Sequence, residues 1–268
     1  MSTQGQSKAG SFKEITRGFV WTSEFLNNVA VKNRVYGLVE IDVTRARRYI
    51  SDYESRTGEK LSFTGWVVKC LAEALDEHKE IQGFRRGKSK IVVFDDVDVS
   101  IVVERELNSE KVPVGYVIRK ANTKSFRQIN DEIRAAQKQE LHGIVLGSEK
   151  LPTLVAVFLR LPGFLRRLGY RKFRSDPFLK KQTMGTVGVT SVGMFGKGAG
   201  WPITIGFHSL EIALGGIASR PRPLGSTGRD GEFLSLTVMI DEEVSYGAPA
   251  ARFVSRLTEL MQSGYGLE

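Results

Sequence analysis

The sequence predicts one α+β domain in which helices cover a large mixed sheet. Two observations predict this class: apolar residues at helical spacing alternate along the chain with runs of strand-like pattern, and no repeat or linker interrupts them after residue 20. The 268 residues, 41% of them apolar and 26% charged, suffice for one sizeable core. Residues 1–11, rich in Ser, Gly, Gln and Lys, are expected to form a flexible arm before a single domain over residues 12–268.

The first half is expected to begin with a strand over 35–41. Asp42 can cap the helix that follows, and Gly58 ends it. A second helix is predicted from Phe63 to His78, because its apolar residues recur every three or four positions. Strand-like runs follow it at 90–94, 97–103 and 112–118.

A third helix is predicted to open at Ser125, whose spacing to Gln128 is that of a capping box. Its expected inner face consists of Phe126, Ile129, Ile133 and Ala136. The second half then continues with strands at 186–192, 212–217 and 233–240. A final helix is expected over 249–262, with Gly264 as its end.

Positive charge is concentrated between these halves. The formal net charge is +9, and residues 150–185 alone hold nine basic residues against the single acid Asp176. The rest of the chain is close to neutral, so a protein that wraps nucleic acid is not indicated. Pro162 is expected to divide this basic insertion into two short amphipathic helices rather than one membrane span.

Other residue types exclude several classes of site. A single cysteine, Cys70, excludes a disulfide framework, and its place on an apolar helix face indicates a packed core thiol. The three histidines, at 78, 142 and 208, are too far apart for a short metal motif, and no metal is expected. The glycines of GMFGKGAG lack the spacing of a phosphate-binding loop. Without an apolar run near the N-terminus, a cytoplasmic location is expected.

Four segments carry a resemblance to a known family: FTGWVVKCLAEALDEHKEIQG (63–83), VPVGYVIRKANTKSFRQINDEI (112–133), TVGVTSVGMFG (186–196) and LTVMIDEEVSYGAPAARFVSRLTELM (236–261). In this order they resemble the catalytic domain of the dihydrolipoamide acyltransferases of 2-oxoacid dehydrogenase complexes. That family shares its fold with chloramphenicol acetyltransferase. The resemblance therefore implies a two-layer sandwich and the transfer of an acyl group between coenzyme A and a thiol or hydroxyl acceptor.

The chain departs from the family at the expected catalytic base. The family's HxxxDG motif becomes EEVSYG here, so Glu242 stands at the histidine position and Tyr246 at the aspartate position, while Gly247 is retained. A carboxylate with a pKa near 4.3 is a weaker base than an imidazole by about 2 units, or roughly 3 kcal/mol of driving force. Burial or a neighbouring carboxylate would raise the pKa of this glutamate and recover part of the lost driving force. Glu242 is a candidate general base, and the alternative is a solvated acidic turn.

The resemblance also implies roles for residues of the preceding strands. Thr190 stands where the family places the Ser or Thr hydroxyl that steadies the oxyanion from a neighbouring subunit, and Ser191 beside it is a candidate contact for coenzyme A. The alternative for Thr190 is an ordinary β-branched strand residue. His208 could replace the missing base from another loop, whereas a histidine on a connection is more often structural.

The basic insertion has three interpretations. It could bind an anionic membrane surface through residues 150–181, or wall a coenzyme A site with Arg166 and Arg167 near the phosphates, or simply cover the core with a solvated cationic face. The resemblance implies a homotrimer or a larger assembly of trimers, with 2-oxoacid dehydrogenase components as partners. No lipoyl domain precedes the core in this sequence, so a lipoyl thiol is expected from another chain. A catalytically inactive scaffold is the alternative to an acyltransferase.

Overall fold

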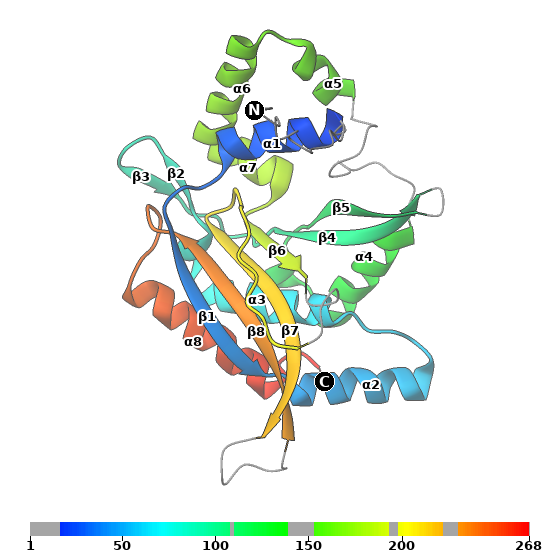
Figure 1. Ribbon diagram of the computed structural model, residues 1–268. Coiled ribbons are helices and arrows are strands. Elements are labelled where there is room, and N and C mark those ends of the chain that lie inside the picture. The colour runs from blue at the N-terminus through cyan, green and yellow to red at the C-terminus, as the bar shows by residue number, and fades with distance from the viewer. Residues whose placement is uncertain (1–16, 108–109, 139–152, 193–197, 222–229, 268) are drawn as a thin grey trace, which may run out of the picture.

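The computed structural model describes residues 17–107, 110–138, 153–192, 198–221 and 230–267. A six-stranded sheet forms its centre, and the predicted α+β class is confirmed (Figure 1). The sheet has the order β1-β8-β7-β6-β4-β5, in which β6 runs parallel to both of its neighbours and the other pairs are antiparallel. The strands are β1 (Arg34–Asp42), β4 (Val99–Leu107), β5 (Glu110–Ile118), β6 (Val187–Ser191), β7 (Leu210–Pro221) and β8 (Asp230–Asp241).

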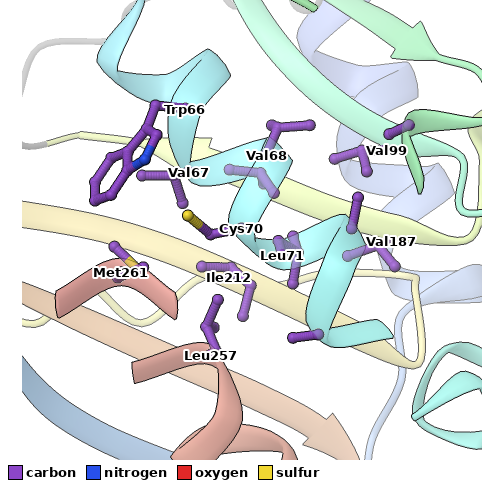
Figure 2. Close-up of a cluster of buried hydrophobic side chains, with 14 of the residues drawn as sticks. Trp66, Val67, Val68, Cys70, Leu71, Val99, Val187, Ile212, Leu257 and Met261 are labelled. Carbon is purple, nitrogen blue, oxygen red and sulfur yellow. The ribbon is translucent and has the colours of Figure 1, made fainter. Parts of the chain in front are cut away.

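Four helices pack on one face of this sheet and enclose the core. They are α2 (Thr44–Thr57), α3 (Phe63–Glu77), α4 (Phe126–Lys138) and α8 (Ala248–Ser263). Figure 2 shows Cys70 of α3 among apolar side chains that include Ile212, Leu257 and Met261. The thiol is fully buried, and burial raises its pKa, which agrees with the predicted core role. Two 3₁₀ turns, η1 (Lys79–Gln82) and η2 (Ala121–Thr123), complete this layer.

Local sequence signals set several helix ends as predicted. The helix α2 ends at Gly58 as expected, but its N-cap is Val43 and not Asp42, whose carboxylate accepts the N–H of Thr44 from one residue earlier. Ser125 and Gln128 bond reciprocally as a capping box before α4, with side chain to backbone distances of 2.8 and 3.2 Å. The predicted inner face of α4 is buried. The strand predicted at 212–217 is longer than expected, and it carries a bulge between Leu214 and Ile217.

A second group of helices forms a lobe beyond one end of the sheet (Figure 1). The predicted break at Pro162 is confirmed, because it separates α5 (Thr153–Arg160) from α6 (Gly163–Ser175). Phe25 packs its helix on α6 through edge contacts with Tyr170 and Phe173. It also contacts Phe207, just before the strand β7 of the sheet. The sequence reasoning missed α1 (Arg17–Val29), α7 (Pro177–Met184) and the strand β2 (Phe84–Arg86), which pairs with β3 (Lys90–Val92).

Three sequence features lie outside the described residues. They are the predicted arm at 1–11, His142, and most of the glycine-rich run at 193–197. The described continuation of that run, residues 198–206, crosses the face of the sheet opposite the helices. There the indole N–H of Trp201 donates to Val39 O, and the Gly200 N–H donates to the Ser235 hydroxyl. The crossing is close, because a Cβ at Gly216 would lie 1.7 Å from Gly198 O.

Candidate active site

Glu242 occupies a tightly bonded turn at the end of β8. Its N–H donates to Asn33 O, and the N–H groups of Val244 and Ser245 donate to Asp241 O. The Asp241 carboxylate accepts the N–H of Glu243, which closes the turn further. The backbone is therefore fixed, while the Glu242 side chain is exposed to solvent. A rigid backbone that presents an exposed carboxylate suits a group that must meet another molecule.

Thr190 points to the opposite face of the sheet from the core helices. Val187 and Val189 of β6 belong to the core. Side chains alternate along a strand, so Thr190, which follows Val189, faces the other way. Its register partners place Thr190, Ala213, Thr237 and Leu38 in one row across four strands. Within the described residues the Thr190 hydroxyl has no hydrogen-bond partner, and Leu38 is 54% exposed.

One chain does not bring Glu242 and Thr190 together. Thr190 lies in the same row as Thr237 of β8. Glu242 follows Thr237 by five residues, just beyond the end of β8. At about 3.3 Å per residue, this places the two side chains about 17 Å apart along the strands and two strands apart sideways. No hydrogen bond or shared substrate atom can span that separation. A site that used both residues would need them from different copies.

His208 is buried and both of its ring nitrogens are occupied. Nε2 lies 2.8 Å from Met184 O, and Nδ1 lies 3.2 Å from Oε1 of Glu211. Burial alone would raise the pKa of Glu211, but hydrogen bonds from His208 and the nearby charge of Arg34 hold that pKa below its usual range. With 2% of its surface exposed, the imidazole has no access to a substrate. The geometry gives His208 a structural part instead of the replacement base considered from the sequence.

A basic cleft of about 480 Å³ opens beside the Glu242 turn. Its floor includes Asp241 and Glu243, the two neighbours of Glu242 in the chain. Arg85 of β2 forms an ion pair with Glu243, so one carboxylate of the cleft is already neutralised. The cations that line the cleft outnumber the two acids, and they are Lys32, Arg85, Arg171, Arg174 and Lys180. A cleft of this size and charge suits a small anionic ligand.

Lys180 is the most deeply placed of these cations. The Asp176 side chain caps α7, and Lys181 reaches the Asp98 carboxylate at 2.9 Å, so the helix that carries Lys180 is held firmly. Burial lowers the pKa of Lys180 to about 8, although the charge of Asp241 opposes this. The ammonium lies 4.6 Å from the centre of the Phe84 ring, and it forms no ion pair with a described residue.

Comparisons with known proteins identify the architecture. Residues 26–146 match the family described as 2-oxoacid dehydrogenases acyltransferase (catalytic domain). No curated protein sequence matches the chain. Among solved structures, a probable dihydrolipoamide acetyltransferase from Listeria monocytogenes 4b F2365 superposes with a TM-score of 0.67 at 18% identity, with 97% of each chain covered. The cubic core of the pyruvate dehydrogenase multienzyme complex gives 0.66 at 19% identity, covering 98% of this chain and 96% of that one.

The chain has the fold of the dihydrolipoamide acyltransferase catalytic cores. Chloramphenicol acetyltransferase shares it, with a TM-score of 0.53 at 12% identity over 89% of this chain and 94% of that one. The resemblance drawn from the sequence motifs, and the sandwich that it implied, are thereby confirmed. Residues 26–146 thus match that catalytic-domain family, and the likeness to the solved structures extends the same fold over nearly the whole chain.

The backbone conformation at position 247 favours the glycine that stands there. Gly247 has φ +58° and ψ −124°, a conformation that side chains with a Cβ rarely adopt, and it leads directly into α8. Tyr246 before it is 71% exposed. The side chains of both Glu242 and Tyr246 face solvent.

The remaining predicted residues lie apart from this turn. Arg166 is engaged by the lobe: its Nε donates to Glu24 at 2.9 Å, and its Nη1 donates to Leu161 O. Arg167 is exposed and forms no ion pair with a described residue. Ser191 ends β6 next to Thr190. Arg166 and Arg167 therefore do not line the basic cleft, although Arg171, Arg174 and Lys180 of the same insertion do.

Sequence reasoning missed the cleft because its walls come from distant segments. The charge count indicated the basic insertion as a whole. Which of its cations face the cleft depends on how the chain turns between α6 and α7, and the charge count does not give this. The described residues contain no cluster of His, Cys, Asp or Glu that could hold a metal ion. None of the helices in the described ranges combines the length and the apolar character needed to cross a bilayer.

Proposed function

We propose that this protein transfers an acyl group between coenzyme A and a thiol or hydroxyl acceptor. The observation that carries the proposal is the Glu242 carboxylate, held on a rigid turn between two residues that line a basic cleft. The sequence resemblance aligns this turn with the family's catalytic motif, and the chain has the fold of the acyltransferase cores.

In this proposal each group has one task. Glu242 removes the proton of the acceptor as its sulfur or oxygen attacks the thioester carbonyl. The Thr190 hydroxyl of a neighbouring copy donates to the oxyanion that forms. Coenzyme A leaves as its thiol when the intermediate collapses. Arg171, Arg174 and Lys180 supply charge for its phosphates, in place of the Arg166 and Arg167 considered from the sequence.

The assembly that the proposal needs is a homotrimer or an assembly of trimers. Thr190 faces a surface on which apolar side chains remain exposed in the single chain: Tyr36, Leu38, Trp201, Ile203 and Ile205. Burial of such a patch against a second copy would be favourable. The proposal requires that this association place Thr190 of one copy beside Glu242 of another. One structural relative is described as a cubic core, which supports a larger assembly with dehydrogenase components as partners.

The test is an assay of thiol release from acetyl and longer acyl derivatives of coenzyme A with dihydrolipoamide as acceptor. We expect turnover by the wild type, and Glu242→Gln should lower kcat at least about 100-fold, the usual contribution of a general base. Glu259→Gln, on the exposed face of α8, is the matched control and should retain full activity. If no donor and acceptor pair gives turnover, the enzymatic proposal fails.

A non-catalytic scaffold is the second candidate, and the exposed Tyr246 favours it. This side chain stands at the position of the motif's aspartate and is 71% exposed, so the carboxylate that the family carries at that position is lost. The double variant Glu242→His with Tyr246→Asp discriminates between the two candidates. Activity that appears only in this variant supports a scaffold that has lost its catalytic groups. Activity in the wild type, lost in Glu242→Gln, supports the enzyme.

A further inference from the structure

The outward face of the α5–α6 hairpin is fixed by contacts on its inward side. Arg166 bonds to Glu24 of α1 and to the carbonyls of Leu159 and Leu161 at the end of α5. Tyr170 packs against Phe25 and Phe158 with ring centroids 6.2 and 5.1 Å apart. These contacts set the rotation of α6 about its axis. The side chains on the opposite side of α6 therefore point away from the protein.

That outward face is apolar at its centre. Phe164 and Leu168 are 65% and 62% exposed, and they stand one turn apart on α6. Val157 of α5 is 52% exposed, and Leu161 and Leu165 at the bend are also exposed. In Figure 1 the two helices lie at the periphery of the lobe, away from the sheet. These five large apolar side chains form an exposed patch on one hairpin, which is typical of a surface that binds another molecule.

Positive charge surrounds this patch without compensation. The exposed cations of α5 and α6 that do not line the basic cleft are Arg160, Arg167 and Lys172. None of them forms an ion pair with a described residue, and the described part of this hairpin contains no carboxylate before Asp176. The central parts of protein interfaces are usually depleted in charge, whereas helices that lie on anionic lipid combine apolar and cationic side chains on one face.

We propose that this hairpin docks on an anionic lipid bilayer, with α6 parallel to the surface. Phe164 and Leu168 enter the boundary between headgroups and acyl chains, and Arg160, Arg167 and Lys172 contact lipid phosphates. The apolar patch alone does not distinguish lipid from a protein partner. The ring of unpaired cations does, because it matches a negatively charged planar surface.

The test is flotation of the full chain with vesicles. The wild type should bind phosphatidylcholine vesicles that contain 30% phosphatidylglycerol, and binding should fall at least about tenfold between about 0.1 and 0.5 M NaCl. Pure phosphatidylcholine vesicles should bind it much less. The double variant Phe164→Ser with Leu168→Ser should lose at least about tenfold in binding. The triple variant Arg160→Gln, Arg167→Gln and Lys172→Gln should lose both the binding and its salt dependence.

The control variant is Ile91→Ser with Val93→Ser, which removes two apolar side chains that are 44% and 48% exposed elsewhere. It should bind vesicles as the wild type does, and circular dichroism should show all variants folded. Absence of binding by the wild type would overturn the proposal, as would equal binding to neutral vesicles. A changed sedimentation coefficient in the Phe164 and Leu168 variant, without any vesicle binding by the wild type, would assign the face to contacts between proteins instead.

Discussion

His208 and Glu211 form a buried pair in which Nδ1 of the ring lies 3.2 Å from Oε1 of the carboxylate. The backbone N–H groups of Phe207 and His208 donate to the same oxygen, and the Arg34 guanidinium lies 3.8 Å from it. On its other side the ring bonds to Met184 O at the end of α7. The pair therefore joins α7, the start of β7 and the start of β1.

Loss of the imidazole should destabilise the fold strongly. His208→Ala leaves the Glu211 charge buried with one partner fewer. Removal of one partner from a buried pair typically lowers the unfolding free energy by about 3–5 kcal/mol. Urea denaturation at pH 7 measures the change. His78→Ala is the control, because His78 is partly exposed and should lose less than about 1 kcal/mol. Equal losses in the two variants would contradict the role assigned to His208.

The same pair predicts how stability depends on pH. The pKa of Glu211 in the folded chain lies below its ordinary value of 4.5, so the folded state binds fewer protons there than the unfolded state. The contribution of Glu211 is present above about pH 4.5 and is lost as the pH falls through the lowered pKa. Glu211→Gln should therefore flatten the fall in stability below pH 4.5. Identical acid unfolding curves for this variant and the wild type would contradict the assignment.

Much of the fold follows from local chemistry that the sequence displays. The capping box at Ser125, the end of α2 at Gly58 and the break at Pro162 depend on neighbouring residues, so the pattern predicts them. α1 escaped prediction because its contacts, such as Phe25 with Phe207, come from distant segments. α7 escaped because its eight residues show little periodicity, and its Asp176 cap is the one signal that could have revealed it.

The candidate site was predictable only where a motif marks it. Glu242 and Thr190 are found from flanking sequence, because the strand and turn around them keep a recognisable pattern. The basic cleft depends on which of several cations turn inward, and this is decided by the Lys181–Asp98 bond and the packing of α7. His208 shows the opposite case, since its burial between Glu211 and Met184 O has no signal in the sequence.

Replacement of Lys180 should stabilise the protein near neutral pH. Burial holds the pKa of this amine at about 8, so below that pH the folded chain carries a poorly solvated ammonium. Lys180→Met keeps the packing of the stem on Phe84 and should raise the unfolding free energy by about 1–3 kcal/mol at pH 7. The gain should shrink between pH 8 and 10.5, where the unfolded lysine also loses its proton. Guanidinium denaturation at both ends of this range measures it, and a gain independent of pH would contradict the burial argument.

The crossing of residues 198–206 over β7 should not tolerate a methyl group. A Cβ at Gly216 would lie 1.7 Å from the backbone oxygen of Gly198, which no side-chain rotation can relieve. Gly216→Ala should therefore lower the unfolding free energy by about 2 kcal/mol or more. Gly115→Ala is the matched control in another strand, since a Cβ there meets nothing within 4 Å. Thermal unfolding of the two variants compares them, and equal melting temperatures would show that the crossing segment is free to move away.

The separation of Glu242 from Thr190 within one chain predicts complementation between inactive variants. Glu242→Gln and Thr190→Val should each lose activity as homogeneous assemblies. If a site combines Glu242 of one copy with Thr190 of the next, assemblies that contain both variants form some sites with two intact residues. In a trimer that contains both variants, one of the three sites has both residues intact, so about one third of the wild-type activity should return.

Co-expression of the two variants with different tags, followed by sequential purification on both, yields the mixed assemblies for the thiol-release assay. The control is each variant carried alone through the same purification, which should remain inactive. A mixture with no more activity than its parts would place Glu242 and Thr190 in separate roles. It would also remove the reason for expecting the site between copies, because the distance of about 17 Å along the strands forbids cooperation inside one chain.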